Sequence, residues 1–286
     1  MIKKGRKSPA QHISFMAHRK FLWLKVSIIL SLLSILGYVT TDFDPVRNGG
    51  TWYGYSLGVI SALLILWLSL LGIRKRAITA GNWSLKNWTS AHVYLGLSLF
   101  VIATLHSGFQ VGWNIHTLAY VLMIIVIVSG MIGVFFYIYI PRRMSDNRSE
   151  MGQADMLKEI SNLNAMLDDA AQPLDDKYIA IIRAAIDKTK LRRSIFHRFS
   201  VSPKRCRTYK ALTFFQQEMR NEDANERIDI LNIISVLEQK NSLLLKIRKH
   251  ARYKTRLQVW LYVHLPITFA LIAALIAHIV SVFYYS

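Results

Sequence analysis

Five long apolar segments alternate with polar ones along the chain, at about residues 21–40, 55–73, 89–110, 115–140 and 258–284. A helix needs roughly 20 mostly apolar residues to cross the hydrocarbon core of a bilayer. Each segment therefore predicts a membrane-spanning helix. The first apolar run is too long for the core of a signal peptide, and no small-residue cleavage site follows it, so we expect an uncleaved first span.

The long polar segment before the last apolar run has the periodicity of helices that pack in water. Four apolar residues recur there at helical spacing: Met156, Ile160, Leu163 and Leu167. No glycine or proline occurs from Lys204 to Leu265, so residues 226–256 are predicted to continue as one helix into the fifth span. The predicted fold is all-α: an integral membrane bundle of five transmembrane helices, with a helical cytoplasmic insertion between the fourth and the fifth.

Composition and charge agree with a membrane protein that has a basic cytoplasmic part. Of the 286 residues 52% are apolar or aromatic, yet 36 Lys and Arg against 17 Asp and Glu give a formal net charge of +19. A soluble enzyme, a disordered chain and a disulfide scaffold do not combine these properties. Cys206 is the only cysteine, which excludes an intrachain disulfide, a covalently attached haem and an iron–sulfur cluster held by this chain alone.

The distribution of basic residues predicts the orientation. Residues 1–20 carry six Lys or Arg, residues 74–88 four and residues 142–256 24, whereas the loops on the other side carry one or none. Cytoplasmic loops of membrane proteins are enriched in Lys and Arg, so we expect a bacterial inner-membrane protein with its N-terminus in the cytoplasm and its C-terminus outside. The expected parts are a basic cytoplasmic N-terminus (1–20), four transmembrane helices (21–141), a helical basic cytoplasmic domain (142–256) and the fifth span (257–286).

The spacing of the intramembrane histidines carries the functional signal. His92 and His106 are 14 residues apart on the third span, and His264 and His278 are 14 apart on the fifth. Fourteen residues make nearly four helical turns, so the two histidines of each span face nearly the same way, about 21 Å apart along the axis. The two spans run in the same direction, so we expect His92 to lie level with His264, and His106 level with His278.

Two such cross-helix pairs could each clamp a planar metal macrocycle between two imidazoles, because imidazole is a strong axial ligand for haem iron. Two protein ligands close the coordination sphere and favour electron transfer over oxygen chemistry. Interhelical hydrogen bonding is the alternative role of such polar residues. The repeated spacing on two parallel spans favours the ligand hypothesis, because ionisable residues in spans are costly and usually functional.

The sequence resembles di-haem transmembrane b-type cytochromes over about residues 85–140 and 257–286, through the segments His92–Gly96, His106–Gly108, His264–Pro266 and His278. The resemblance implies two non-covalent b-type haems and a membrane subunit of a larger oxidoreductase. It further implies electron exchange with quinone or quinol, and redox partner subunits such as a cytochrome c, an iron–sulfur protein or a flavoprotein. Residues 142–256 lie outside it. The chain has no dinucleotide-binding fingerprint, so further substrate chemistry would belong to other subunits.

Residues beside the four histidines are candidates for further haem or quinone contacts. Gly96 and Gly108 would let a flat ring approach the backbone, or serve ordinary small-residue packing. His116, beside Trp113 and Asn114, could bind a quinol headgroup, hydrogen-bond a haem propionate, accept a proton or replace an assigned ligand; it could equally be an interfacial anchor residue. Arg142 and Arg143 could pair with haem propionates or only set the topology.

A basic run with interleaved aromatic residues, Lys188 to Lys210, continues to Phe215 in the cytoplasmic domain. We expect it to contact anionic lipid, with an acidic redox partner second and nucleic acid last. Two alternatives to the electron-transfer subunit remain at this stage. One is a stand-alone transmembrane reductase, for instance of ferric iron, and the other is a non-redox membrane scaffold with a cytoplasmic interaction domain.

Overall fold

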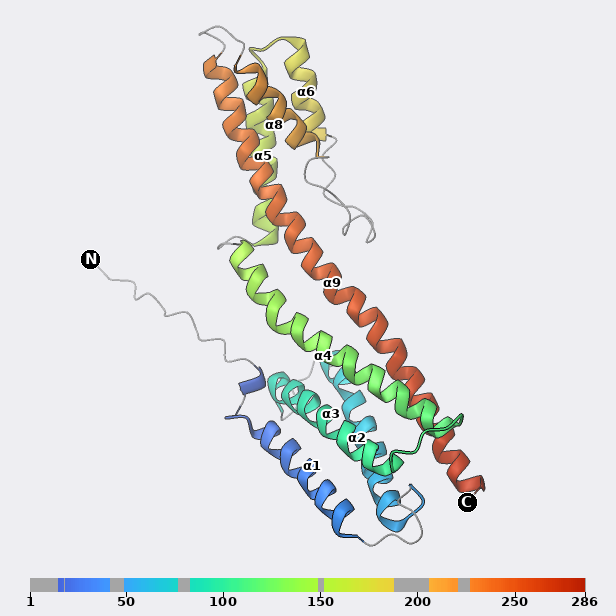
Figure 1. Ribbon diagram of the computed structural model, residues 1–286. Coiled ribbons are helices and arrows are strands. Elements are labelled where there is room, and N and C mark those ends of the chain that lie inside the picture. The colour runs from blue at the N-terminus through green and yellow to red at the C-terminus, as the bar shows by residue number, and fades with distance from the viewer. Residues whose placement is uncertain are drawn as a thin grey trace, which may run out of the picture. The chain divides into compact units, whose positions relative to one another are not determined.

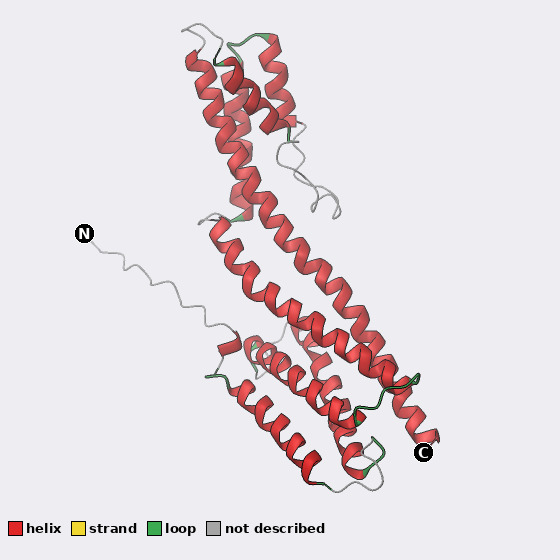
Figure 2. Ribbon diagram, viewed as in Figure 1, coloured by secondary structure: helices red, strands yellow, loops and turns green. Residues whose placement is uncertain are grey.

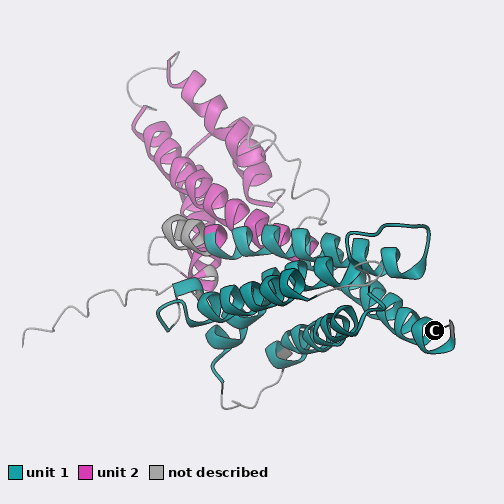
Figure 3. Ribbon diagram, turned by 60° about the horizontal axis from the view of Figure 1, so that its bottom comes forward, with its two compact units in different colours: residues 1–138, 260–286 teal, residues 139–259 magenta. Residues whose placement is uncertain are grey.

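A computed structural model describes residues 15–17, 19–41, 49–76, 83–148, 152–187, 206–220 and 227–285. These residues form helices joined by short turns and contain no strand (Figures 1 and 2). The all-α prediction is confirmed for them. The chain divides into two compact units, residues 1–138 with 260–286 and residues 139–259 (Figure 3), and each is considered by itself.

The first unit contains the apolar helices. They are α1 (Leu22–Thr40), α2 (Trp52–Arg76), α3 (Leu85–Ser107), the first part of α4 (Ile115–Arg148) and the last part of α9 (Arg227–Tyr285), preceded by the short 3-10 helix η1 (Phe15–Ala17). Among the described residues, five helices are long and apolar enough to cross a membrane, as the apolar pattern predicts. Large apolar side chains such as Leu33, Leu63 and Phe135 are about 60% exposed. The surface of the unit is therefore strongly apolar, which is unfavourable in water.

Helix α3 is the most enclosed of the five. Half of its apolar window is buried, against 28% or less in the others, and it packs against both α1 and α2. Small and polar residues permit this contact: Ser27 on α1 donates a hydrogen bond to the carbonyl of Tyr94, and Trp23 donates one to the buried Asn87 side chain. Both histidines of α3 are thereby placed next to neighbouring helices rather than toward the outside of the unit.

The second unit is a small helical domain with an apolar core. It contains α5 (Gln153–Ala171), α6 (Asp176–Asp187), α8 (Arg207–Glu218) and the first part of α9. The four predicted face residues of α5 (Met156, Ile160, Leu163 and Leu167) are all buried in this core. Lys240 is also buried and donates a hydrogen bond of 3.1 Å to the carbonyl of Ala185, in the last turn of α6, where helix carbonyls lack intrahelical partners.

The predictions for this part of the chain concern the last helix and the basic run. Helix α9 runs without a break from Arg227 to Tyr285, so the predicted continuation into the fifth apolar helix is confirmed. Most of the basic run, residues 188–205, lies outside the described residues. Of its aromatic neighbours, Phe215 is fully buried, and Tyr209 and Phe214 are partly buried against the same core. The expected contact of the basic run with anionic lipid stays a prediction.

Candidate functional site

Three histidines from three different helices converge in the first unit. His106 lies at the end of α3, His116 in the first turn of α4 and His278 near the end of α9. One ligand nitrogen from each lies within 4.8 Å of the other two. Their ring centroids are 5.3 Å (His106–His116), 4.9 Å (His116–His278) and 6.2 Å (His106–His278) apart. We call this set the three-histidine cluster.

The imidazole of His106 is held from behind by the backbone of α2. Its Nδ1 lies 2.7 Å from the carbonyl oxygen of Gly54. A carbonyl only accepts hydrogen bonds, so Nδ1 carries the proton and Nε2 keeps a free lone pair. Hydrogen bonds of this kind orient metal-binding histidines. The ring also lies close to Gly58, where a Cβ atom would come within 2.6 Å of Cε1 of His106.

His92 repeats this arrangement four turns earlier on α3. Its Nδ1 lies 3.0 Å from the carbonyl oxygen of Leu68, which again leaves Nε2 free. Leu68 and Gly54 are themselves 14 residues apart on α2, so two antiparallel helices repeat the same histidine-to-carbonyl contact at two levels. His92 is close enough to His264 for an electrostatic interaction. We call these two residues the His92–His264 pair.

His264 is oriented by side chains that the sequence analysis missed. Ser129 on α4 donates its hydroxyl proton to the carbonyl of Val126 at 2.9 Å, and its oxygen lies 2.6 Å from Nδ1 of His264. A hydroxyl that donates to Val126 has no second proton, so in this arrangement Nδ1 of His264 donates and Nε2 is again free. The indole of Trp260 stacks on the same imidazole at 5.2 Å and donates to the carbonyl of Ser129 at 2.7 Å.

The surroundings of the histidines lack carboxylates and include one lysine. The described residues of the first unit contain neither Asp nor Glu. Lys75, at the end of α2, interacts electrostatically with both members of the His92–His264 pair, and its ammonium lies 5.7 Å from the ring centre of Tyr137. Lys75 is one of the four basic residues of the 74–88 loop, which predict the orientation. Imidazoles without carboxylates form a donor set for transition metals rather than for Ca²⁺ or Mg²⁺.

The spacing of the rings can be compared with that of two axial ligands of one metal ion. Imidazole nitrogens bind such ions at about 2.0–2.1 Å, so the nitrogens of two opposite ligands lie about 4 Å apart and their ring centroids about 6 Å apart. The 6.2 Å between His106 and His278 agrees with this value. His116 lies almost equally far from both of them, so its ring occupies the space beside the midpoint of this axis. A flat macrocycle held by His106 and His278 would require the His116 side chain to turn aside.

The other predicted site residues have mixed roles. A Cβ atom on Gly96, one turn after His92, would meet nothing within 4 Å, so this helix face has room for a flat group. Gly108 is the C-cap of α3 with φ of 56°, a left-handed conformation that favours glycine with or without a cofactor. Arg142 and Arg143 belong to α4, but their side chains lie outside the described part of the structure.

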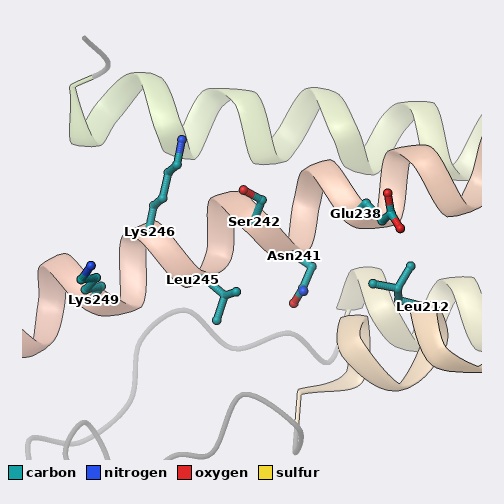
Figure 4. A pocket seen from close by; sticks show the side chains of 7 residues that line it. All are labelled: Leu212, Glu238, Asn241, Ser242, Leu245, Lys246 and Lys249. Atoms are coloured by element: carbon teal, nitrogen blue, oxygen red, sulfur yellow. The ribbon is translucent and has the colours of Figure 1, made fainter. Parts of the chain in front are cut away.

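The second unit contains a pocket. It measures about 380 Å³ and lies between α8 and α9, where Glu238, Asn241, Lys246 and Lys249 contribute polar groups (Figure 4). Glu238 accepts a hydrogen bond of 3.2 Å from Gln216. The residues that line the pocket include no histidine and no cysteine, so the pocket contributes nothing to the chemistry of the histidines.

No protein-family model, curated protein or solved structure matches this chain. The function is therefore inferred from the chain's own residues.

Proposed function

We propose that this chain is a membrane electron-transfer protein that binds two b-type haems, one between His92 and His264 and one between His106 and His278. It would act in a bacterial inner membrane as a subunit of a larger oxidoreductase and exchange electrons with quinone or quinol. The observation that carries the proposal is the repeated contact on α2 and α3, in which His92 and His106 each use Nδ1 for a backbone carbonyl and keep Nε2 free.

The charges of the first unit support haem over a bare ion. A divalent ion among neutral imidazoles would carry an uncompensated double charge in an apolar bundle, and such burial is costly. The dianionic porphyrin ring neutralises ferrous iron, so haem needs no carboxylate from the protein. The described residues of this unit supply none, and the open space at Gly96 lies beside His92, where a flat ring would bind.

The residues would perform separate tasks in electron transfer. When bound, haem supplies iron that is oxidised and reduced by one electron. The four histidines hold the two levels about 21 Å apart along the helix axes, while Gly54, Leu68 and Ser129 fix the imidazole tautomers. Lys75 places a positive charge near the His92–His264 pair, where it would attract the carboxylates of a haem or an electron-donating partner.

Haem content tests the proposal directly. The purified full-length chain should contain two haems by pyridine haemochrome assay, both extractable with acidified acetone. The variants His92→Ala and His264→Ala should remove the same component of the reduced-minus-oxidised spectrum, and His106→Ala should remove the other. His250→Ala, a histidine of the second unit, serves as the matched control and should keep both. A chain expressed with ample haem that binds none would overturn the proposal.

A metal-ion centre is the second candidate, and the three-histidine cluster favours it. Three imidazoles with nitrogens within 4.8 Å resemble the ligand sets of zinc, copper and non-haem iron sites, which keep one position open for another ligand. An added anion would have to balance the charge. Elemental analysis of the purified chain distinguishes the candidates: one equivalent of copper or zinc, lost in His116→Ala and accompanied by no second haem, would establish the ion site.

A further inference from the structure

We propose that Trp260 is a positioning residue for His264, and that Gly133 on the facing helix leaves the space its indole needs. The indole sets the plane of the imidazole and keeps the hydrogen bond from His264 to Ser129 in place. This inference rests on the proposed binding of a haem between His92 and His264. It gives a role to two residues that lie outside the histidine pattern.

The rings of Trp260 and His264 are stacked, with centroids 5.2 Å apart and an angle of 25° between their planes. The two residues are four positions apart on α9, so their side chains are neighbours on one helix face. The hydrogen bond to Ser129 holds the imidazole at Nδ1. Stacking against a large flat ring adds a second restraint, because the imidazole cannot tilt without losing that contact.

The indole is itself fixed by the residue that holds the imidazole. Nε1 of Trp260 donates a hydrogen bond of 2.7 Å to the carbonyl of Ser129. A carbonyl oxygen has two lone pairs, so it can accept this bond besides the one within its own helix. Ser129 thus contacts the indole through its carbonyl and the imidazole of His264 through its hydroxyl. A change in one of these contacts should therefore alter the other.

Gly133 provides the space in which the indole lies. It follows Ser129 by four residues on α4, which is about one helical turn. A Cβ atom on Gly133 would overlap Cζ2 and Cε2 of Trp260, so any larger residue would push the indole away. At Gly130, a Cβ atom would make only an ordinary contact of 3.8 Å with Cε1 of His264. The requirement for glycine is therefore specific to the position that faces the indole.

The two imidazoles of the His92–His264 pair are oriented by different helices. The carbonyl of Leu68 on α2 holds His92, whereas Ser129 on α4 and the indole of Trp260 hold His264. Such contacts behind metal ligands fix the ring orientation and tune the bound metal. The angle between the two ring planes is therefore set by the protein, and Trp260 contributes to it without contacting the iron.

Electron paramagnetic resonance and redox titration of the purified full-length chain test the role of Trp260. In a low-spin ferric haem with two imidazole ligands, the g values depend on the angle between the ring planes. Trp260→Leu should therefore shift the largest g value of the haem bound by His264 while the haem content stays unchanged. Trp260→Phe keeps a flat ring and should shift it less. Tyr262→Leu, at an exposed position of α9, is the matched control and should leave the spectrum unaltered.

Gly133→Ala tests the same contact from the other helix. It leaves Trp260 in the sequence but displaces its indole, so it should shift the same g value as Trp260→Leu does. Ile132→Ala, at the neighbouring exposed position of α4, should have no such effect. The signal of the other haem in each sample reports that the variant is folded.

A double variant shows whether Trp260 acts through Ser129. Trp260→Phe lacks the indole N–H and should raise the midpoint potential, by at most the tenfold change in relative affinity that corresponds to about 59 mV. Ser129→Ala/Trp260→Phe should then match Ser129→Ala alone, because changes in one shared contact do not add. The proposal is wrong if the two shifts add, or if Trp260→Leu and Gly133→Ala leave the g value unchanged. Failure of the proposed function looks different, since the unmodified chain would then contain no haem at all.

Discussion

Ser129 on α4 and His264 on α9 are joined by a hydrogen bond of 2.6 Å between the serine Oγ and the histidine Nδ1. The hydroxyl donates a hydrogen bond to the carbonyl of Val126. When it also accepts a hydrogen bond from Nδ1–H of His264, the imidazole becomes a stronger electron donor. A stronger donor would stabilise the oxidised state of an iron bound at His264. In the proposed function Ser129 is therefore a positioning residue for that histidine.

Ser129→Ala should raise the midpoint potential of the haem bound by His264. A tenfold change in the relative affinity for the two iron states corresponds to about 59 mV for one electron, and we expect a shift of that order in a redox titration. Ser129→Thr keeps the hydroxyl and should restore the potential. The haem of the other level is the internal reference, and equal shifts at both levels would contradict the assignment.

Gly58→Ala should weaken haem binding at His106. The new Cβ would lie 2.6 Å from Cε1 of a ring that the Gly54 carbonyl holds in place, so the imidazole would be pushed out of position. Misplacing a ligand typically costs about tenfold or more in affinity, which haem titration of the apoprotein measures. Gly72→Ala is the matched control, 14 residues along the same helix, because a Cβ there meets nothing within 4 Å.

Arg248→Met should raise the pKa of Cys206 in the second unit. Burial raises the pKa of this thiol, but the guanidinium of Arg248, 2.9 Å from Sγ, together with the backbone N–H groups of Tyr209 and Thr208, brings it below its usual range. The thiolate stabilises the folded unit above the ordinary thiol pKa, and this contribution is lost as the pH falls through the lowered value.

The pH midpoint of Cys206 alkylation measures this change. It should move upward in Arg248→Met, toward the ordinary value of about 8.5, and the fold should lose the thiolate contribution that is present above that ordinary pKa. Lys249→Met, at the adjacent exposed position of α9, should leave the midpoint unchanged. An unaltered midpoint in Arg248→Met would show that the helix backbone alone holds the thiolate.

Cysteine labelling tests the proposed orientation. In a Cys206→Ser background, a cysteine at the exposed Gln110, in the turn between α3 and α4, should react with an impermeant maleimide in spheroplasts. A cysteine at the exposed Ser161 of α5 should react only after lysis, because the second unit would face the cytoplasm. The reverse pattern would invert the orientation and place the three-histidine cluster on the cytoplasmic side.

Much of the fold follows from local patterns. Five apolar runs predict five long helices, and the face of Met156, Ile160, Leu163 and Leu167 is buried in α5 as its spacing indicates. The continuation of α9 into the last apolar run follows from the lack of glycine and proline up to Leu265, although the helix also continues past Pro266. The burial of Phe215 does not follow from such a local pattern, because only the packed unit decides which face of α8 is covered.

The histidine spacing was readable from the sequence because an α-helix has a fixed rise and turn per residue. Fourteen residues place His92 and His106 on one face of α3 in any environment. Tertiary structure alone decided which nitrogen of each ring is free and which further residues join. Ser129 lies 135 residues before His264, and the Gly54 carbonyl that holds His106 belongs to another helix. Likewise, His116 meets His278 only because α4 and α9 pack together, and no periodicity within one helix encodes the contacts between two.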